Sequence, residues 1–541
     1  MENDPRLEEL TFKMGLPPIV GRLLFNRGIK DEEEARIFLY GDFGDLSSPF
    51  LFQEMERAVE RIERAIRSGE QILIFGDYDV DGITSTALLV RGIESLGGRV
   101  SYIIPNRISH GYGAKPHHVE EIKKLGATLV ITVDNGIKSI EFAQQLKREG
   151  IDLIITDHHL PGQELPDAYA IIDPHTEDRF VPKNLAGVGV AFKLLHAIFL
   201  KKGSEPKVYP YLKMVALGTI ADMVELLGEN RIMVKKGLEL INEGNSFGLS
   251  KLMNVSGLSG KRITPREVAF RISPRINAAG RILDPELALR LLLSRKEEEA
   301  ARLASELNEL NQQRQKLEAR ILKEAEAMVR EEEPVIFLYS EGWHRGVLGI
   351  VAYRLAKKYR KPAIVFSVEG EHAFGSGRSP QGMPLVKALD EAEEFLLSYG
   401  GHEQAAGLVV RTGDLDRVKE ILEDAFSSFS PEERKDIWLD GEVTFEDIWL
   451  FYGFLHLFPP YGIGNPQPRF LARDVEVVHN PGPWYNGFRT VLKQGDKIIP
   501  GVFWKGGLLG KLKKGEKLDI VFTLRENNGQ GPEIIIEEEE M

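Results

Sequence analysis

The sequence predicts an α/β protein whose first large domain holds a doubly wound parallel sheet. Between residues 51 and 172, short runs rich in Ile, Val and Leu alternate with helix-length stretches, which is the pattern of buried parallel strands in βαβ units. Acidic or imidazole groups directly follow three of these runs, at 71–76, 128–133 and 151–156. Ligands bind beyond the carboxyl ends of the strands in open α/β sheets, so we expect these groups to meet in one crevice.

The elements of this domain are expected in a regular order. The predicted helices span 54–68, 83–96, 117–124 and 138–148, and the predicted strands span 71–76, 100–105, 128–133, 151–156 and 168–172. Alternation on this scale favours a doubly wound sheet over other layered folds. The first 50 residues are expected to form short helices and loops that carry no recognisable chemistry.

Residues 296–332 differ from the sequence around them. They contain almost no Gly or Pro, and Leu or Ile recurs among many charges, as in a long amphipathic helix. The apolar repeat is short and irregular, which favours a helix joining two domains over a coiled-coil seam. We expect α/β alternation to resume from Pro334 to about residue 429, with strands at 335–339 and 363–367.

A small barrel of the oligonucleotide-binding (OB) type is predicted near the C-terminus. The Pro- and Gly-rich segment 459–466 precedes five short β-type runs, at 475–478, 488–492, 497–503, 518–524 and 533–536, which is the strand number of an OB fold. The expected organisation is therefore a helical segment (1–50), a catalytic domain (51–295), a connecting helix (296–333), a smaller α/β domain (334–430) and the barrel (436–541).

Composition narrows the class of protein. The 541 residues include no cysteine, which excludes disulfides and thiolate-bound zinc or iron–sulfur clusters. The N-terminus has no basic region leading into an apolar stretch, and no run approaches the roughly 20 apolar residues of a membrane span. We therefore expect a soluble, cytoplasmic protein without a membrane partner.

The charge distribution bears on nucleic-acid binding. A net charge of −13 argues against a general nucleic-acid binder, because Lys and Arg make the phosphate contacts. The segment 481–520 nevertheless contains eight cationic and three acidic residues, the cations being Arg489, Lys493, Lys497, Lys505, Lys511, Lys513, Lys514 and Lys517. This segment is either a local phosphate-binding surface or a solvated face of mixed charge.

The residues at the ends of the predicted strands suggest a metal site. Asp79 and Asp81 would both face the crevice if their loop is extended. Asp134, His158 and the later Asp222 complete a set of four carboxylates and one imidazole, which suits two Mg²⁺ or Mn²⁺ ions better than zinc. A pair of ions about 3.5–4 Å apart can neutralise charge on a transferring phosphoryl group, so phosphoester hydrolysis is expected. An Asp-x-Asp alone is usually a turn or a helix cap; three clusters after three strands favour the metal site.

Several motifs carry a family resemblance. Residues 76–82, 132–136 and 157–159 resemble the successive motifs of the DHH phosphoesterase superfamily. The resemblance to the bacterial RecJ family, single-strand-specific 5′→3′ DNA exonucleases, covers nearly the whole chain. Its further motifs stand at 105–107, 111–113, 185–189, 274–281, 343–352, 375–379 and 400–407.

The resemblance implies a role for each matching residue. The implied metal ligands are Asp77, Asp79, Asp81, Asp134, His158 and Asp222, although Phe75 stands where many superfamily members have a histidine. The implied catalytic residues are Asp134, His158, Asp157 and His159, of which Asp157 and His159 would orient the ligands or contact the scissile phosphate. Residues 375–379 and 400–402 would belong to a DHH-associated domain that holds the DNA end. The implied substrate-binding residues are Arg107, Tyr112, Arg275, Asn277, Arg281, Ser376, Arg378 and His402.

The resemblance implies an enzyme that degrades single-stranded DNA from its 5′ end to 5′-mononucleotides, in DNA repair and recombination. The expected cofactors are two Mn²⁺ or Mg²⁺ ions per active site. The expected partners are single-stranded DNA with a 5′ end, a RecQ-type helicase and a single-strand-binding protein, and the chain is expected to be a monomer. Two alternatives remain at this point: a phosphodiesterase for short oligonucleotides or cyclic dinucleotides, and a non-catalytic DNA-binding scaffold. The barrel argues against the first, and the complete carboxylate set argues against the second.

Overall fold

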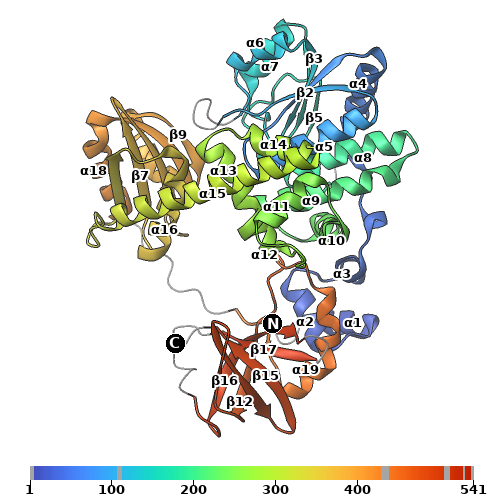
Figure 1. Cartoon of the computed structure of the whole chain (residues 1–541), viewed down its shortest axis with the longest axis vertical. Helices are drawn as coiled ribbons and strands as arrows, with labels where there is room; N and C mark the ends of the chain where they lie inside the picture. Colours follow the sequence, from blue (N-terminus) through green and yellow to red (C-terminus); the bar gives the residue numbers. More distant parts are fainter. Residues whose placement is uncertain are drawn as a thin grey trace.

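The structure is a computed structural model that describes residues 5–106, 113–178, 181–427, 438–504, 512–527 and 531–537. Two α/β domains lie side by side and are joined by the long helix α15 (Glu297–Glu326). A C-terminal barrel lies below them and packs with the N-terminal helices (Figure 1). Within the described part of the chain, no helix has the length and apolar character needed to span a bilayer.

The first domain contains the predicted parallel sheet. Its strands run in the order β2-β1-β3-β4-β5, all parallel, which is a doubly wound order with its switch point between β1 and β3. The strands are β1 (Gln71–Phe75), β2 (Arg99–Ile103), β3 (Ala127–Val133), β4 (Asp152–Thr156) and β5 (Ala170–Ile172). The predicted fold class is confirmed for this domain.

Helices cover both faces of this sheet because successive strand residues are apolar. Ile72 and Ile74 belong to the core on one face, whereas Leu73 and Phe75 belong to the core on the other, as the pleat requires. One face is covered by α4 (Met55–Ser68), α5 (Val80–Ser95) and α8 (Gly187–Lys201), and the other by α6 (Val119–Lys124) and α7 (Ile140–Arg148). The parallel strands are therefore buried on both sides.

The helices that come after β5 in the sequence complete the first domain. It consists of α9 (Leu212–Asp222), α10 (Gly228–Glu243), α11 (Phe247–Val255), α12 (Pro265–Glu267), a π-helical turn (Val268–Ile272), α13 (Ser273–Ile282) and α14 (Glu286–Leu293). The apolar residues of α15 up to Leu310 join the same core. From Ile321 onward, α15 packs with the second domain instead, so this helix is structurally shared.

The second domain departs from the predicted α/β alternation. Its sheet order is β6-β7-β8-β10-β9, and only β6 and β7 are parallel. The strands β7 and β8 are antiparallel because the two residues Gly370 and Glu371 join them, too few for a parallel crossover. The elements are β6 (Ile336–Glu341), α16 (Arg345–Tyr359), β7 (Ala363–Glu369), β8 (His372–Arg378), α17 (Leu385–Glu391), β9 (Leu396–His402), β10 (Ala405–Arg411) and α18 (Leu415–Ser427).

The predicted five-stranded barrel is present. Its strands are β12 (Phe470–Val477), β14 (Gly487–Gln494), β15 (Lys497–Phe503), β16 (Lys517–Glu526) and β17 (Pro532–Ile536), and a β12–β14 pairing closes it. Two short strands, β11 (Gly441–Glu442) and β13 (Gly482–Trp484), extend the sheet. Strand β12 begins five residues before the predicted start, because a register irregularity between Ala472 and Val475 interrupts its apolar pattern.

The N-terminal helices share one hydrophobic core with the barrel. These helices are α1 (Pro5–Met14), α2 (Pro18–Asn26) and α3 (Glu32–Tyr40). Their buried residues, such as Leu24 and Phe38, pack against Phe458 and the apolar residues of the barrel and of α19 (Phe445–Phe451). Phe43 and Phe52 already belong to the core of the first domain. Residues 10–39 thus form one module with the barrel, which we call the terminal module.

A buried arginine joins the terminal module to the first domain. Arg231 of α10 donates four hydrogen bonds, to the carbonyls of Phe38, Leu457, Phe458 and Pro459, at 2.6–3.1 Å. Its guanidinium also lies over the Phe38 ring, 3.9 Å from the centroid. Burial lowers the pKa of Arg231 to about 10, so the side chain stays charged at neutral pH.

We expect Arg231→Leu to destabilise the terminal module by about 3 kcal/mol or more, because several buried carbonyls lose their donor at once. Four of the five tryptophans lie in this module, at positions 438, 449, 484 and 504, so urea unfolding followed by tryptophan fluorescence is a direct measurement. Lys235→Leu, one turn further along α10, is the matched control. Equal unfolding midpoints for the two variants would contradict this role.

Candidate metal centre and substrate face

The first acidic cluster lies where β1 ends and α5 begins. The two carboxylates are not held in an extended loop: Asp79 is the N-cap of α5 and accepts a hydrogen bond from the Gly82 amide at 3.1 Å, while Asp81 lies in the first helical turn. Helix α5 starts at Val80, three residues before the predicted start, because this cap satisfies an amide that would otherwise lack an acceptor. Asp77 and Asp79 consequently face a different neighbour from Asp81.

The N-terminus of α8 holds the Asp81 carboxylate. The Gly187 amide donates to Asp81 Oδ2 at 2.7 Å, and the Val188 amide donates to Oδ1 at 2.9 Å. A helix N-terminus favours a negative charge through its free amides and its dipole. Burial, with the charges of Asp222 and Asp79, nevertheless raises the pKa of Asp81 well above its usual value. Asp81 is therefore fixed in place, at a position where a bound cation would offset its charge.

Asp134 follows β3 in a conformation that few residues adopt. Its φ of +60° lies in the left-handed region, where a non-glycine residue is strained and where strain often marks a functional site. Asp134 is buried, and burial with the charges of the neighbouring carboxylates raises its pKa well above its usual value. A Cβ on Gly187 would lie 2.7 Å from Asp134 Oδ1. Only glycine at the start of α8 leaves room for this carboxylate.

Asp222 lies at the C-terminus of a helix, whereas Asp81 is held at a helix N-terminus. It is the last residue of α9, and Met223 after it has a φ of +64°. The C-terminus of a helix disfavours a negative charge, and burial, with the charge of Asp79, raises the pKa of Asp222 to about 6. A cation bound at this carboxylate would remove the conflict.

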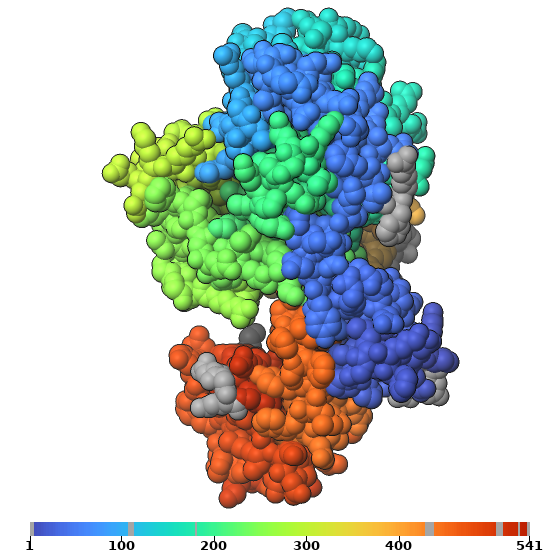
Figure 2. Space-filling model, turned by 90° about the vertical axis from the view of Figure 1, so that its right-hand side faces the viewer, coloured from blue at the N-terminus to red at the C-terminus, as the bar shows by residue number. Residues whose placement is uncertain are grey.

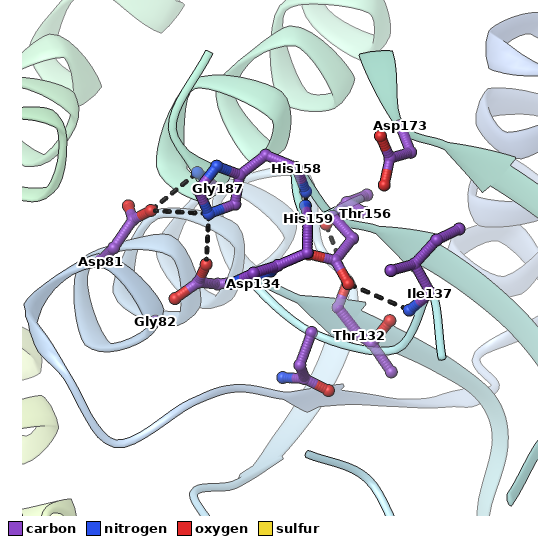
Figure 3. Close-up of polar contacts among 12 residues, drawn as sticks. Asp81, Gly82, Thr132, Asp134, Ile137, Thr156, His158, His159, Asp173 and Gly187 are labelled. Carbon is purple, nitrogen blue, oxygen red and sulfur yellow. Dashed lines mark hydrogen bonds and ion pairs between the residues drawn. The ribbon is translucent and has the colours of Figure 1, made fainter. Parts of the chain in front are cut away.

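His158 points its Nε2 atom into the carboxylates. Nε2 lies 3.1 Å from Asp134 Oδ1 and 4.0 Å from Asp81 Oδ2 (Figure 3). It lies 3.8 Å from Asp222 Oδ2. The ring donates a hydrogen bond to the Leu185 backbone, and burial lowers the pKa of His158 to about 4. The imidazole is thus neutral. Among the described residues, Nε2 makes no hydrogen bond, so its lone pair faces the carboxylate oxygens.

The donors form overlapping groups that fit metal ions. Asp77, Asp79 and Asp134 form one group, and Asp81, His158 and Asp222 form a second; within each, one possible ligand atom per residue lies within 4.8 Å of the others. A third group, Asp134, His158 and His159, overlaps both. A lone pair and several carboxylates directed at one another repel unless cations lie between them. All six predicted metal ligands are therefore brought together in donor sets suited to hard divalent ions.

Asp157 ties the neighbouring loops together. Its carboxylate accepts hydrogen bonds from the amides of Ile137 at 3.0 Å and His158 at 2.8 Å, and His159 Nδ1 lies 2.7 Å from Oδ1. Burial opposes the charge of Asp157, but the contact with His159 lowers its pKa; the same contact raises the pKa of His159 despite burial. Asp157 thus positions the loops after β3 and β4, and it orients His159.

Asp173 was not predicted as a site residue, although it obeys the same rule as the others. It directly follows β5 and is fully buried, and the charges of Asp157 and His159 act on its carboxyl group. Asp173 Oδ1 accepts from the His175 amide at 2.8 Å, and the His175 ring hydrogen-bonds to the His158 backbone. Burial raises the pKa of Asp173 to about 7. Its place directly after a predicted strand is the signal that could have identified it.

The second domain presents the predicted DNA-end residues on one face of its sheet. Arg378 of β8 is in register with Ala405 and His402, and Ser376 is in register with Gly407 and Gly400. Residues in register on neighbouring strands share a face, so Ser376, Arg378 and His402 line the same face. Nothing lies within 4 Å of a Cβ built on Gly400 or Gly407. The glycines therefore keep a flat strip beside Ser376 open to a close approach.

Tight helix packing links this face to the loops after β1, β3 and β4 that carry the candidate metal ligands, which we call the metal loops. Gly280 of α13 packs on Tyr78, and Arg281 Nη1 donates to the Gly346 carbonyl at 3.2 Å. One turn further along α16, a Cβ on Gly349 would lie 3.0 Å from Ser376 Oγ. The loop that holds Asp77 and Asp79 is therefore connected to Ser376 and Arg378 through a short chain of contacts.

The remaining predicted substrate-binding residues lie either on helix α13 or outside the described residues. Arg107 and Tyr112 lie outside the described residues. Arg275 donates to Asn308 Oδ1 at 3.0 Å and to the Arg271 carbonyl at 2.6 Å, so part of its donor capacity serves the fold. Asn277 lies half-buried on α13. The structure places Arg275, Asn277 and Arg281 on one helix that ends at the metal loops.

Three family models match the chain in the order of its domains. The DHH family N-terminal domain matches residues 71–219, the DHHA1 domain matches 332–428, and the RecJ OB domain matches 439–535. The fold and the carboxylate–imidazole site thus define a protein of the DHH class with its associated domain. The chain belongs to the RecJ family.

Named relatives and solved structures agree. The single-stranded-DNA-specific exonuclease RecJ of Bacillus subtilis (strain 168) is 36% identical over 98% of this chain and 69% of its own length. The protein of the same name from Salmonella typhimurium is 38% identical over 85% of this chain and 84% of its own length. RecJ of Thermus thermophilus in complex with Mn²⁺ superposes with a TM-score of 0.83 at 31% identity, covering 99% of this chain and 78% of that one. The same protein was also solved with Mg²⁺.

Proposed function

We propose that this chain is a metal-dependent exonuclease specific for single-stranded DNA, which degrades it 5′→3′ to 5′-mononucleotides in DNA repair and recombination. The observation that carries the proposal is the packed connection between two features: a buried cluster of carboxylates with a neutral imidazole, and an open sheet face bearing Ser376 and Arg378. The first suits metal-assisted phosphoester hydrolysis, and the second suits a terminal phosphate.

The proposed metal ligands are Asp77, Asp79, Asp81, Asp134, His158 and Asp222, which would hold two Mn²⁺ or Mg²⁺ ions. When bound, such ions polarise the scissile phosphate, activate water and neutralise developing charge. Asp134 and His158 each occur in two of the three donor groups, which supports a central place for both in the proposed ligand set. Asp157 and His159 keep the loop of His158 in position, and His159 is oriented toward the same cluster.

We propose that Arg378 and Ser376 bind the 5′-terminal phosphate. Arg378 Nη1 lies 3.4 Å from Ser376 Oγ and donates to the Gly377 carbonyl at 2.7 Å, so two donors are held side by side on one face. A guanidinium suits a terminal phosphate because its planar donors match the phosphate oxygens. A cleft between the two α/β domains that is too narrow for a duplex, and a barrel that grips the incoming strand, complete the proposal. A RecQ-type helicase and a single-strand-binding protein are the proposed partners.

A direct experiment compares 5′- and 3′-labelled single strands with labelled duplex, in Mg²⁺, in Mn²⁺ and in chelator. We expect the 5′ label to be released first and as a mononucleotide, only from single strands and only with metal. Early release of the 3′ label would reverse the proposed polarity. Equal rates on duplex would contradict the single-strand specificity.

Arg378→Ala should weaken hydrolysis of 5′-phosphorylated strands far more than hydrolysis of strands with a 5′-hydroxyl. The substitution removes a charge-assisted contact of roughly 1.5–3 kcal/mol, a loss of about 10- to 150-fold in kcat/KM. Arg411→Ala is the matched control, since Arg411 lies on the neighbouring strand β10 and is exposed. Equal losses on both substrates would place the phosphate site elsewhere.

A further inference from the structure

A basic surface lies on the first domain outside the residues discussed so far. Lys261, Arg262, Arg266 and Arg271 are all exposed, on and just before α12 and on the π-helical turn. Between residues 254 and 277 the chain has five cationic side chains and one acidic side chain, Glu267, whose carboxylate is bonded to Thr264. This positive stretch contrasts with the net charge of −13 of the whole chain. We call these four cations the α12 patch.

Among the residues that the structure describes, the α12 patch has no anionic partners, unlike other surface cations. Within the described ranges, none of its four side chains makes an ion pair or a hydrogen bond, whereas many other exposed Lys and Arg residues pair with Asp or Glu. Arg275, four residues after Arg271, bonds only to uncharged groups within the described part of the chain, and burial together with the charge of Arg271 lowers its pKa. Two guanidinium groups this close without a carboxylate repel each other, so the surface is set up for an external anion.

An exposed aromatic ring lies within the α12 patch. Phe270 is 76% exposed, in the π-helical turn directly before Arg271. Such turns frequently occur at functional sites, because the extra residue alters which side chains a helix presents. An exposed aromatic side chain among cations has the composition of a single-strand binding site, where bases stack on rings while Lys and Arg contact phosphates.

The position of the α12 patch gives this surface a role. Helix α12, the π-helical turn and α13 form one continuous helical run from Pro265 to Ile282, about 27 Å long at 1.5 Å per residue. Its C-terminal end reaches Tyr78 and Gly346, beside the metal loops. Its other end lies at the edge of the domain that faces the barrel (Figure 1). In the space-filling view, a notch separates this edge from the barrel (Figure 2).

We propose that the α12 patch and Phe270 form a relay site for single-stranded DNA between the barrel and the active-site cleft. The cations contact phosphates, and Phe270 stacks on one base. The strand then follows the α12–α13 run past Arg275 to the metal centre. The inference rests on the proposed function, and it names a segment of the strand path that neither the metal centre nor the barrel supplies.

The experiment measures DNA affinity against salt concentration in chelator, so that no hydrolysis occurs. The variants are Arg266→Ala with Arg271→Ala, and Phe270→Ala. Lys124→Ala with Arg148→Ala is the matched control. These two exposed cations are the last residues of α6 and α7, and both helices lie at the end of the molecule away from the barrel. Each protein is tested with a single strand of about 30 nucleotides and with one of about 4.

For the long strand, we expect the arginine double variant to flatten the slope of log affinity against log salt by about 1.4, since each lost phosphate contact contributes about 0.7. Phe270→Ala should weaken binding about fivefold or more with an unchanged slope, which is the loss of one stacked base. Hydrolysis of the short strand with metal should match the wild-type rate in both variants, and the control should match wild type throughout.

The possible outcomes separate this inference from the proposed function. If the wild-type chain neither binds nor degrades single strands, the proposed function is wrong. If the wild-type chain degrades them but the arginine double variant keeps the full salt slope, the relay site is overturned, and an acidic protein segment becomes the better partner for the α12 patch. A loss of short-strand hydrolysis in the variants would also overturn it, because the patch would then act in the active site.

Discussion

Asp134→Ala is expected to abolish hydrolysis while the fold and the binding of single-stranded DNA persist. Asp134 is the one carboxylate that belongs to two of the three donor groups found among the described residues, so its removal would take a proposed ligand from each of those two groups. Loss of several kcal/mol of charge stabilisation corresponds to a decrease of about a thousandfold or more in kcat. The measurement is single-turnover cleavage of a 5′-phosphorylated strand at saturating metal.

The control for this prediction separates lost chemistry from lost structure. Asp167→Ala removes an exposed carboxylate paired with Lys147 and far less buried than Asp134. We expect wild-type cleavage for Asp167→Ala and wild-type affinity in chelator for both variants. Turnover of metal-saturated Asp134→Ala within tenfold of wild type would eliminate Asp134 as a shared ligand.

Gly187→Ala is expected to lower hydrolysis nearly as much as Asp134→Ala, although glycine has no side chain that could take part in the reaction. The added methyl group would lie 2.7–2.9 Å from three atoms of Asp134, closer than non-bonded atoms tolerate, so Asp134 must move. The same residue supplies the amide that holds Asp81 Oδ2. Displacement of two proposed metal ligands by even a fraction of an ångström should lower kcat about a hundredfold or more.

Gly189→Ala tests whether the effect of Gly187→Ala is local. A methyl group on Gly189, two residues further along α8, would meet Leu185 at 3.4 Å, an ordinary contact. Alanine is also the better helix former at this position. We therefore expect wild-type activity and equal or slightly higher stability for Gly189→Ala. Similar activity losses in both variants would show that α8 as a whole, rather than the Asp134 contact, is sensitive.

Local sequence patterns were sufficient for the parallel sheet and for most of the candidate site. The strands are runs of apolar residues buried on both faces, so their periodicity is strong, and ligands placed directly after a strand inherit its position. Asp134 and His158 could be predicted for that reason. Asp81 could be identified, but its surroundings could not, because the amides that hold it come from residues 187 and 188, more than 100 positions later.

Contacts between distant segments explain what the sequence pattern missed. The order of strands in the second domain depends on a two-residue connection, which alternation alone does not reveal. The N-terminal helices were predicted without a packing partner, because nothing local connects Leu24 or Phe38 with Phe458. The hydrogen-bond partners of Arg231 are backbone carbonyl groups. Every residue has such a group, so the sequence does not show which of them Arg231 contacts.

The shared core of the terminal module has a consequence for the order of folding. Residues 10–39 leave the ribosome before the first domain, yet their packing partners at 443–536 are made after both α/β domains. Domains generally fold as units during synthesis. The apolar faces of α1 to α3 therefore stay without their packing partners while about 400 residues are added. The first domain can close its own core in that interval. The apolar faces of these helices are therefore open to chaperones and to aggregation in the nascent chain.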